Sequence, residues 1–121
     1  MYILMIDPSV RDNITITDAV GVTKTYPYKN RDMLVAVDEF LTEQEKTPKE
    51  IEGMAVLLGV GSFTATRLAV TLVNTWGYVL NIPVIGVREA DWHKEYIEKE
   101  LQQTSVGQYI HAKYSGVPHI G

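Results

Sequence analysis

Two short segments combine residue types that could take part in chemistry: Asp7-Pro8-Ser9 and Gly59-Val60-Gly61-Ser62-Phe63-Thr64. The second segment follows an apolar run and precedes a helical pattern. Backbone N–H groups at such a helix start attract anions such as phosphate, and glycine lets a ligand or another backbone approach closely. The candidate anion-binding residues are Gly59, Gly61, Ser62 and Thr64. Since the segment lacks the lysine of a Walker A loop and the third glycine of GxGxxG, a tight turn without a ligand is the alternative.

The Asp7-Pro8-Ser9 segment ends the first apolar run of the chain. Asp7, with Ser9 beside it, could help to bind Mg²⁺ and phosphate, but one carboxylate is not a metal site. The alternative is that the Asp7 side chain accepts a hydrogen bond from the backbone of its own turn. A small Mg-dependent ATPase or nuclease built on Asp7 is therefore one functional hypothesis.

Other reactive side chains are scarce or scattered. The chain has no cysteine, and His93, His111 and His119 do not have metal-ligand spacing. Ser9 and Ser62 have no partner base that the sequence can show, so a serine nucleophile is not predicted. We expect no catalytic residue, no metal and no cofactor.

Length and charge restrict the class of protein further. A chain of 121 residues fits one domain. A net charge of −4 without a Lys/Arg cluster argues against strong direct binding to nucleic acid. Residues 1–6 lack the basic start of a signal peptide, and no apolar run reaches the roughly 20 residues that span a bilayer. We therefore expect a soluble, cytoplasmic protein that does not bind membranes.

Alternating apolar patterns predict the elements that position the two polar segments. The expected strands are 2–6, 13–17, 22–28, 53–58 and 83–87. The expected helices are 31–45, with Asn30 as its N-cap, 63–80, which ends at Asn81, and 90–103. The order β-β-β-α-β-α-β-α predicts an α/β fold with a mixed five-stranded sheet and helices on its faces, as in ribonuclease-H-like proteins and one lobe of actin-like ATPases. Residues 1–103 are expected to form this lobe. Residues 104–121 are expected to be an ordered surface tail with a short strand-like segment at 109–112, and the alternative is a functional tail.

The first two expected helices carry more apolar residues than one buried stripe needs. In 31–45 the expected stripe is Met33, Val37, Phe40 and Leu41, yet the whole run from Met33 to Val37 is apolar. In 63–80 the only charged residue is Arg67. Its expected buried face is Leu68, Ala69, Leu72, Val73, Trp76, Val79 and Leu80, and the opposite face is Thr64, Arg67, Thr71, Asn74 and Tyr78. Because solvent-facing helix surfaces usually carry charges, this pattern predicts either a surface covered by a partner or two deeply buried helices.

The central segment resembles a known family signature. Residues 57–67, Leu-Leu-Gly-Val-Gly-Ser-Phe-Thr-Ala-Thr-Arg, resemble the GxGSFTxxR motif of the TsaB (YeaZ) family. Residues 80–87 resemble that family's next strand, and residues 3–9 its first strand and Asp-containing turn. Val60 replaces the usual proline and Ala65 the usual glycine. Family members are longer and have a second lobe, whereas 112–120 resemble their C-terminal end, so we expect the N-terminal lobe with a retained tail.

The resemblance implies an actin-like fold and a non-catalytic partner role in forming threonylcarbamoyladenosine at tRNA position 37. In the family, TsaD and TsaE assemble on TsaB, and its first two helices pair with TsaD or with a second TsaB. The residues expected on this pairing surface are Leu34, Val37, Phe63, Arg67, Thr71, Asn74 and Tyr78. Asp7 and Ser9 would be vestiges of a metal or phosphate site. The alternative is a homodimeric structural protein that no longer acts on tRNA.

Overall fold

A computed structural model describes residues 1–28 and 32–111 of the chain, which form a sheet covered by helices. The strands are β1 (Ile3–Asp7), β2 (Asn13–Asp18), β3 (Thr23–Pro27), β4 (Gly53–Leu58) and β5 (Val84–Arg88). They lie in the order β3-β2-β1-β4-β5. The β1–β2 and β2–β3 pairs are antiparallel, whereas β4 is parallel to both β1 and β5. The predicted mixed five-stranded sheet is confirmed.

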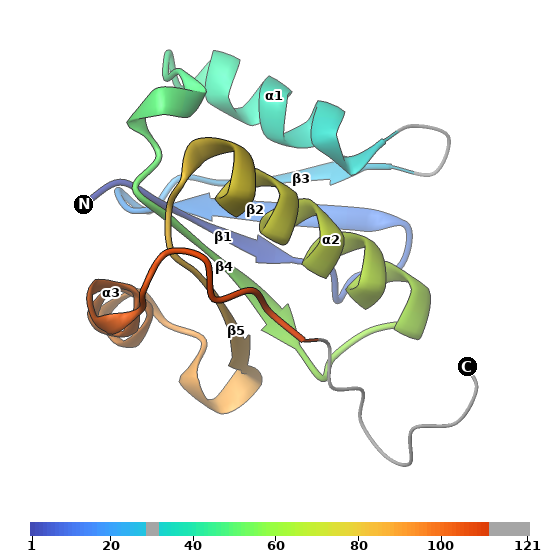
Figure 1. Cartoon of the computed structure of the whole chain (residues 1–121). Helices are drawn as coiled ribbons and strands as arrows, with labels where there is room; N and C mark the ends of the chain where they lie inside the picture. The colour runs from blue at the N-terminus through green and yellow to red at the C-terminus, as the bar shows by residue number, and fades with distance from the viewer. Residues whose placement is uncertain (29–31, 112–121) are drawn as a thin grey trace.

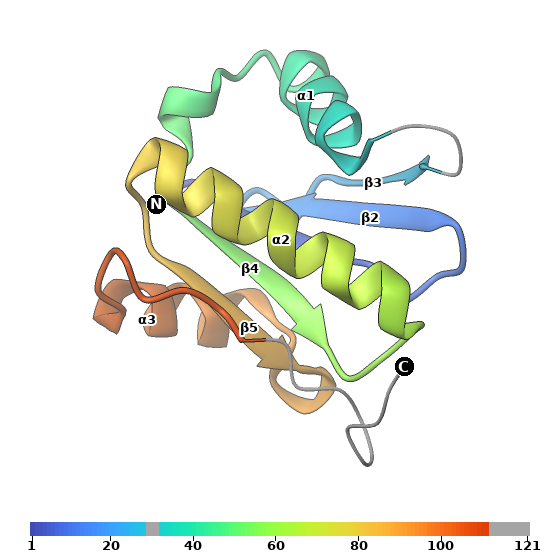
Figure 2. The same cartoon turned by 45° about the vertical axis from the view of Figure 1, so that its right-hand side comes forward.

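Three helices cover the two faces of this sheet. They are α1 (Met33–Glu43), α2 (Phe63–Leu80) and α3 (Lys94–Gln103). The first two lie on one face and α3 lies on the other (Figures 1 and 2). Successive side chains of a strand point to opposite faces, so Leu4 and Ile6 of β1 join the core under α1 and α2, whereas Ile3 and Met5 join the core under α3. Both faces of β1 are thus buried, which explains its continuous apolar sequence.

The buried face of α2 differs from the expected one. Its buried residues are mostly small: Ala65, Thr66, Ala69, Val70, Leu72, Val73 and Gly77. At Gly77 a Cβ atom would lie 2.7 Å from Val84 Cγ1, so the helix approaches β5 more closely than a larger residue permits. Leu68 and Val79, which were expected inside, are 47% and 69% exposed, so that part of the expectation was wrong.

The helix ends follow short-range hydrogen bonds. Asp32 is the N-cap of α1, because its carboxylate accepts a hydrogen bond from the Leu34 N–H at 2.9 Å. The expected cap, Asn30, lies outside the described residues. Asn81 ends α2 in the left-handed conformation, as expected. The third helix begins at Lys94 rather than at residue 90, because residues 89–91 form a separate 3₁₀ turn and His93 is extended.

The segment after α3 runs back across β5 toward α2 (Figure 1). Residues 109–111 do not form the expected strand, and residue 112 and the rest of the tail lie outside the described part of the chain. Within the ranges that the structure describes, no helix is long and apolar enough to cross a membrane.

Candidate functional site

The turns that follow β1 and β4 lie against each other at one end of the sheet. Gly59 and Gly61 both have positive φ angles, +84° and +93°. A Cβ atom at Gly61 would lie 2.9 Å from Ser9 Cα and 3.1 Å from the Pro8 carbonyl oxygen. Gly61 therefore makes room for the backbone of the other turn, which favours the tight-turn interpretation over an open phosphate loop.

The polar side chains of these turns satisfy local backbone groups. Asp7 Oδ1 accepts a hydrogen bond from the Ser9 N–H at 2.8 Å. Ser62 caps α2, because its hydroxyl oxygen accepts a hydrogen bond from the Ala65 N–H at 3.0 Å. Thr64 lies exposed in the first turn of α2. Among residues 1–28 and 32–111, no three His, Asp or Glu side chains gather as a metal site would require.

Four of the seven residues expected on a pairing surface are exposed on α1 and α2. They are Leu34, Arg67, Thr71 and Tyr78. Phe63 is half-buried, and the Arg67 guanidinium lies 5.5 Å from its ring centroid, one helical turn away. The Arg67 charge thus has an aromatic neighbour within its own helix.

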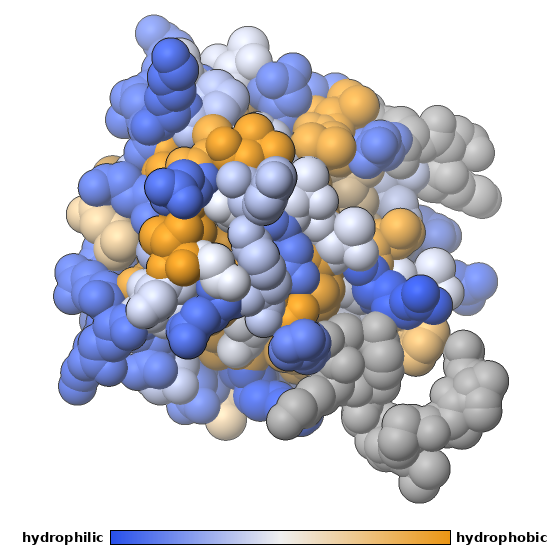
Figure 3. Space-filling model, viewed as in Figure 1, coloured by the Kyte–Doolittle hydropathy of each residue, from blue (hydrophilic) through white to orange (hydrophobic). Residues whose placement is uncertain are grey.

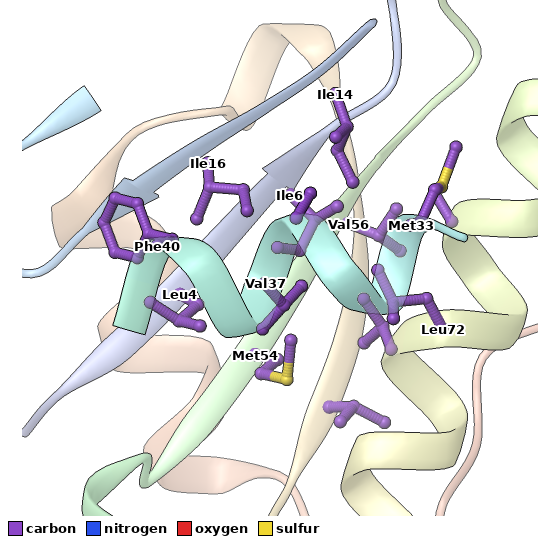
Figure 4. Close-up of a cluster of buried hydrophobic side chains, with 14 of the residues drawn as sticks. Leu4, Ile6, Ile14, Ile16, Met33, Val37, Phe40, Met54, Val56 and Leu72 are labelled. Atoms are coloured by element: carbon purple, nitrogen blue, oxygen red, sulfur yellow. The ribbon is translucent and has the colours of Figure 1, made fainter. Parts of the chain in front are cut away.

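Two of the expected pairing residues, Val37 and Asn74, contact other parts of this chain instead. Val37 is completely buried and points from α1 into the core near Leu4 and Met54 (Figure 4). Its expected place on the pairing surface was therefore wrong, whereas its place in the buried stripe of α1 was right. Asn74 is half-buried, and its amide group makes hydrogen bonds to the backbone of Ile110.

Three hollows meet at one exposed threonine, Thr75, on the outer side of α2. The first is a groove of about 340 Å³ between the helices, lined by Tyr28, Asp32, Met33, Leu34, Leu68, Thr71, Leu72 and Thr75. The second, of about 230 Å³, is lined by Leu34, Pro48, Thr75, Trp76, Val79 and Leu80. The third, of about 410 Å³, is lined by Asn74, Thr75, Tyr78 and Tyr109. We call the exposed part of α1 and α2 around Thr75 the helix-pair surface: Leu34, Leu68, Thr71, Thr75, Tyr78 and Val79.

The helix-pair surface is apolar and almost without charge. Figure 3 shows orange hydrophobic side chains interrupting the blue surface over α1 and α2. Of the described residues that line the three hollows, only Asp32 is charged at neutral pH. Burial and the nearby Asp12 carboxylate raise the pKa of Tyr28, so its hydroxyl stays neutral there.

Sequence reasoning missed Leu68, Thr75 and Val79 as members of this surface. Leu68 and Val79 are large apolar residues, which the helical pattern assigned to the core. Thr75 is a small polar residue without any signal of its own. The low charge of the whole helix was the signal that pointed to this face.

The sheet order and the helix positions define a ribonuclease-H-like lobe of the actin-like ATPase type. Residues 27–117 match the family model described as "TsaD: tRNA N6-adenosine threonylcarbamoyltransferase". The TsaB protein of Bacillus subtilis, described as a tRNA threonylcarbamoyladenosine biosynthesis protein, is 31% identical over 97 residues, which cover 72% of this chain and 41% of that protein. The chain belongs to this family and is a TsaB (YeaZ)-like member of it.

Solved structures show the same fold. YeaZ from Pseudomonas aeruginosa has a TM-score of 0.65 and 20% identity, over 75% of this chain and 46% of that one. A structure described as an uncharacterized protein with similarity to peptidase YEAZ from Pseudomonas aeruginosa has a TM-score of 0.61 and 21% identity, over 74% and 44%. The chain thus spans less than half the length of these relatives.

Proposed function

We propose that the chain is a non-catalytic, cytoplasmic partner protein in threonylcarbamoyladenosine modification of tRNA. It pairs through α1 and α2 with a TsaD-like protein or with a second copy of itself. The observation that carries this proposal is the apolar, almost uncharged helix-pair surface around Thr75. Membership of the TsaD and TsaB family supports the pathway.

The helix-pair surface holds several large apolar side chains in water. Leu34 is 40% exposed, and Tyr78 is 74% exposed. Burying such groups is favourable by about 25 cal/mol per Å² of apolar area. Because α2 has 18 residues and α1 has 11, the two helices are about 27 Å and about 16 Å long, and each is about 10 Å wide with its side chains. The helix pair thus offers about 430 Å² on each side of a contact, which is close to the roughly 1,000 Å² total of a specific interface.

The enzyme hypothesis has less support. Asp7 already accepts the Ser9 N–H, and the backbone of Pro8 and Ser9 fills the space beside Gly61. A Mg-dependent ATPase or nuclease needs further carboxylates near Asp7, and among the described residues no three His, Asp or Glu side chains gather as a metal site needs. These contacts favour a structural role for both turns.

The proposal is tested by size-exclusion chromatography with light scattering. The protein is measured alone, then mixed with the TsaD-like protein of the same organism, and then with a TsaE-like protein as a third component. We expect a complex whose mass equals the sum of this chain and the TsaD-like protein. A homodimer without affinity for the TsaD-like protein would support the structural alternative outside the tRNA pathway, and a strict monomer that binds neither would overturn the proposal.

A further inference from the structure

Strand β5 forms one border of the sheet, because among the described strands it pairs with β4 alone (Figure 1). The Met54 N–H of β4 donates a hydrogen bond to the Pro83 carbonyl oxygen at 3.2 Å. The backbone groups of successive residues turn alternately to the two sides of a strand. Ile85 and Val87 therefore bond to β4, whereas Gly86 turns its N–H and C=O groups to the open side.

The open side of β5 is accessible at Gly86. This residue is exposed, and because glycine has no side chain, the exposure belongs to its backbone. Within residues 1–28 and 32–111, no backbone hydrogen bond outside the β4–β5 pairing reaches Gly86. An unpaired strand edge of this kind can take up an extended peptide as a further strand.

Residues 104–111, which we call the strap, leave a hollow beside this edge. The Ile110 N–H donates a hydrogen bond to Asn74 Oδ1 at 2.8 Å, and Asn74 Nδ2 donates one to the Ile110 carbonyl oxygen at 3.0 Å. Ile110 also occupies the space beside Gly86, where a Cβ atom would lie 3.0 Å from Ile110 Cγ2. The strap is thus held in place, and a hollow of about 510 Å³ lies between it and β5.

The side chains that line this hollow carry no negative charge. The polar ones include Arg88, Gln108 and His111, and none of the described lining residues is Asp or Glu. The Arg88 guanidinium lies over the turn after β4, since a Cβ atom at Gly59 would lie 3.1 Å from its Nη1 atom. In the described part of the chain no carboxylate forms an ion pair with Arg88, including those of the 3₁₀ turn that follows it. A carboxylate from another molecule would complement this cation.

We propose that the open edge of β5 binds an extended acidic segment of a partner protein. The segment adds to the five-stranded sheet as a further strand, held by hydrogen bonds to the Gly86 backbone, and places a carboxylate against Arg88. Since β5 has five residues, the bound segment is about five residues, or about 17 Å, long. Its acidic residue lies two positions from the residue opposite Gly86, because side chains on one face of a strand recur at every second residue.

The site is separate from the helix-pair surface and does not depend on the proposed function. The alternative role of Arg88 is to keep the edge unpaired, since charged side chains on edge strands deter pairing with other chains. The two roles predict opposite effects of removing the charge. Loss of Arg88 weakens the binding of an acidic segment, whereas loss of a deterrent charge leaves peptide binding equal or makes it tighter.

Selection of seven-residue peptides from a random phage-displayed library on the immobilised whole chain tests the inference. The selected peptides are synthesised, and their dissociation constants are measured by fluorescence anisotropy. We expect an acidic residue at a constant position and a loss of about tenfold in affinity for Arg88→Gln. Arg11→Gln is the matched control, because the Arg11 side chain is 95% exposed and lines no part of the hollow.

Methylation of single peptide amides gives a readout that only strand pairing produces. Methyl groups on alternate amides should abolish binding, and those on the amides between them should not, because only every second residue bonds to β5. Selected peptides without an acidic residue, tolerance of every methyl group, or Arg88→Gln binding as tightly as the wild type would each overturn the inference. Peptides lost with Thr75→Arg but kept with Arg88→Gln would also overturn it, and the proposed function would stand.

Discussion

Replacing Gly61 by alanine tests the contact between the two strand-end turns. The new Cβ atom would lie 2.9 Å from Ser9 Cα and 3.1 Å from the Pro8 carbonyl oxygen. The first distance is shorter than real Cβ contacts, and both contacting atoms belong to the backbone, which cannot move aside as a flexible side chain can. The φ angle of +93° adds strain of its own. Gly21 is the matched control, because it has the same φ angle of +93° and no atom within 4 Å of its Cβ position.

The two substitutions differ only in the contact. A residue with a side chain in the left-handed region costs about 1–2 kcal/mol, which we expect for Gly21→Ala. Overpacking against fixed neighbours costs about 1–3 kcal/mol more, so Gly61→Ala should lose about 2–5 kcal/mol in all. With a urea slope of about 1–3 kcal/mol per M, the unfolding midpoints of the two variants should differ by about 1 M.

Urea unfolding followed by far-UV circular dichroism measures both free energies. The slopes of the two variants should agree with that of the wild type, so that only the midpoints change. If Gly61→Ala loses no more stability than Gly21→Ala, the turns after β1 and β4 do not pack together. The space beside Gly61 would then be open to a ligand, and the turn after β4 could act as a phosphate loop.

Three further predictions concern stability and use the same unfolding assay. Val37→Ala should lower the free energy of unfolding by about 2–3 kcal/mol, because it leaves a cavity in the core. Val35→Ala is the control, since Val35 is 43% exposed and its loss should change stability by less than about 0.5 kcal/mol. Equal losses would contradict the burial of Val37. Ser62→Ala should lose about 1 kcal/mol with its N-cap hydrogen bond, and no loss would refute the cap. Burial raises the pKa values of Tyr2 and Tyr26, and the neighbouring carboxylates, Asp18 beside Tyr2 and Glu43 beside Tyr26, raise them further. The two neutral tyrosines therefore contribute fully to stability below about pH 10, and this contribution is lost as the pH rises above it. Tyr2→Phe should make the fall in stability at high pH less steep, and an unchanged slope would contradict this.

The sequence was most informative where one element is bounded by clear signals. The strand Gly53–Leu58 and the helix Phe63–Leu80 have the predicted bounds, because a continuous apolar run ends before Gly59 and the helix is capped by Ser62 and Asn81. The inner face of α2 was not predicted. Its small residues give a weak apolar signal, and the close approach of Gly77 to Val84 is a tertiary contact that no local pattern encodes.

The low-charge helix-pair surface was predicted in kind but only partly in its residues. The low charge of residues 63–80 indicated a covered face, and Leu34, Thr71 and Tyr78 are exposed there. The internal role of Asn74 could not be predicted, since its partner Ile110 lies 36 residues away in the sequence. The two glycines of the turn after β4 were predicted to permit a close approach. The sequence left open whether a ligand or another backbone segment approaches them.

The most direct test of the account is to place a charge at the centre of the helix-pair surface. Thr75→Arg adds a long cation where three apolar hollows meet, and Thr42→Arg adds the same cation at another exposed helix threonine that lines none of them. Both variants are titrated calorimetrically with the TsaD-like protein of the same organism. The account predicts that Thr75→Arg loses binding and that Thr42→Arg binds like the wild type. Equal binding by both variants would contradict the claim that this chain pairs through α1 and α2.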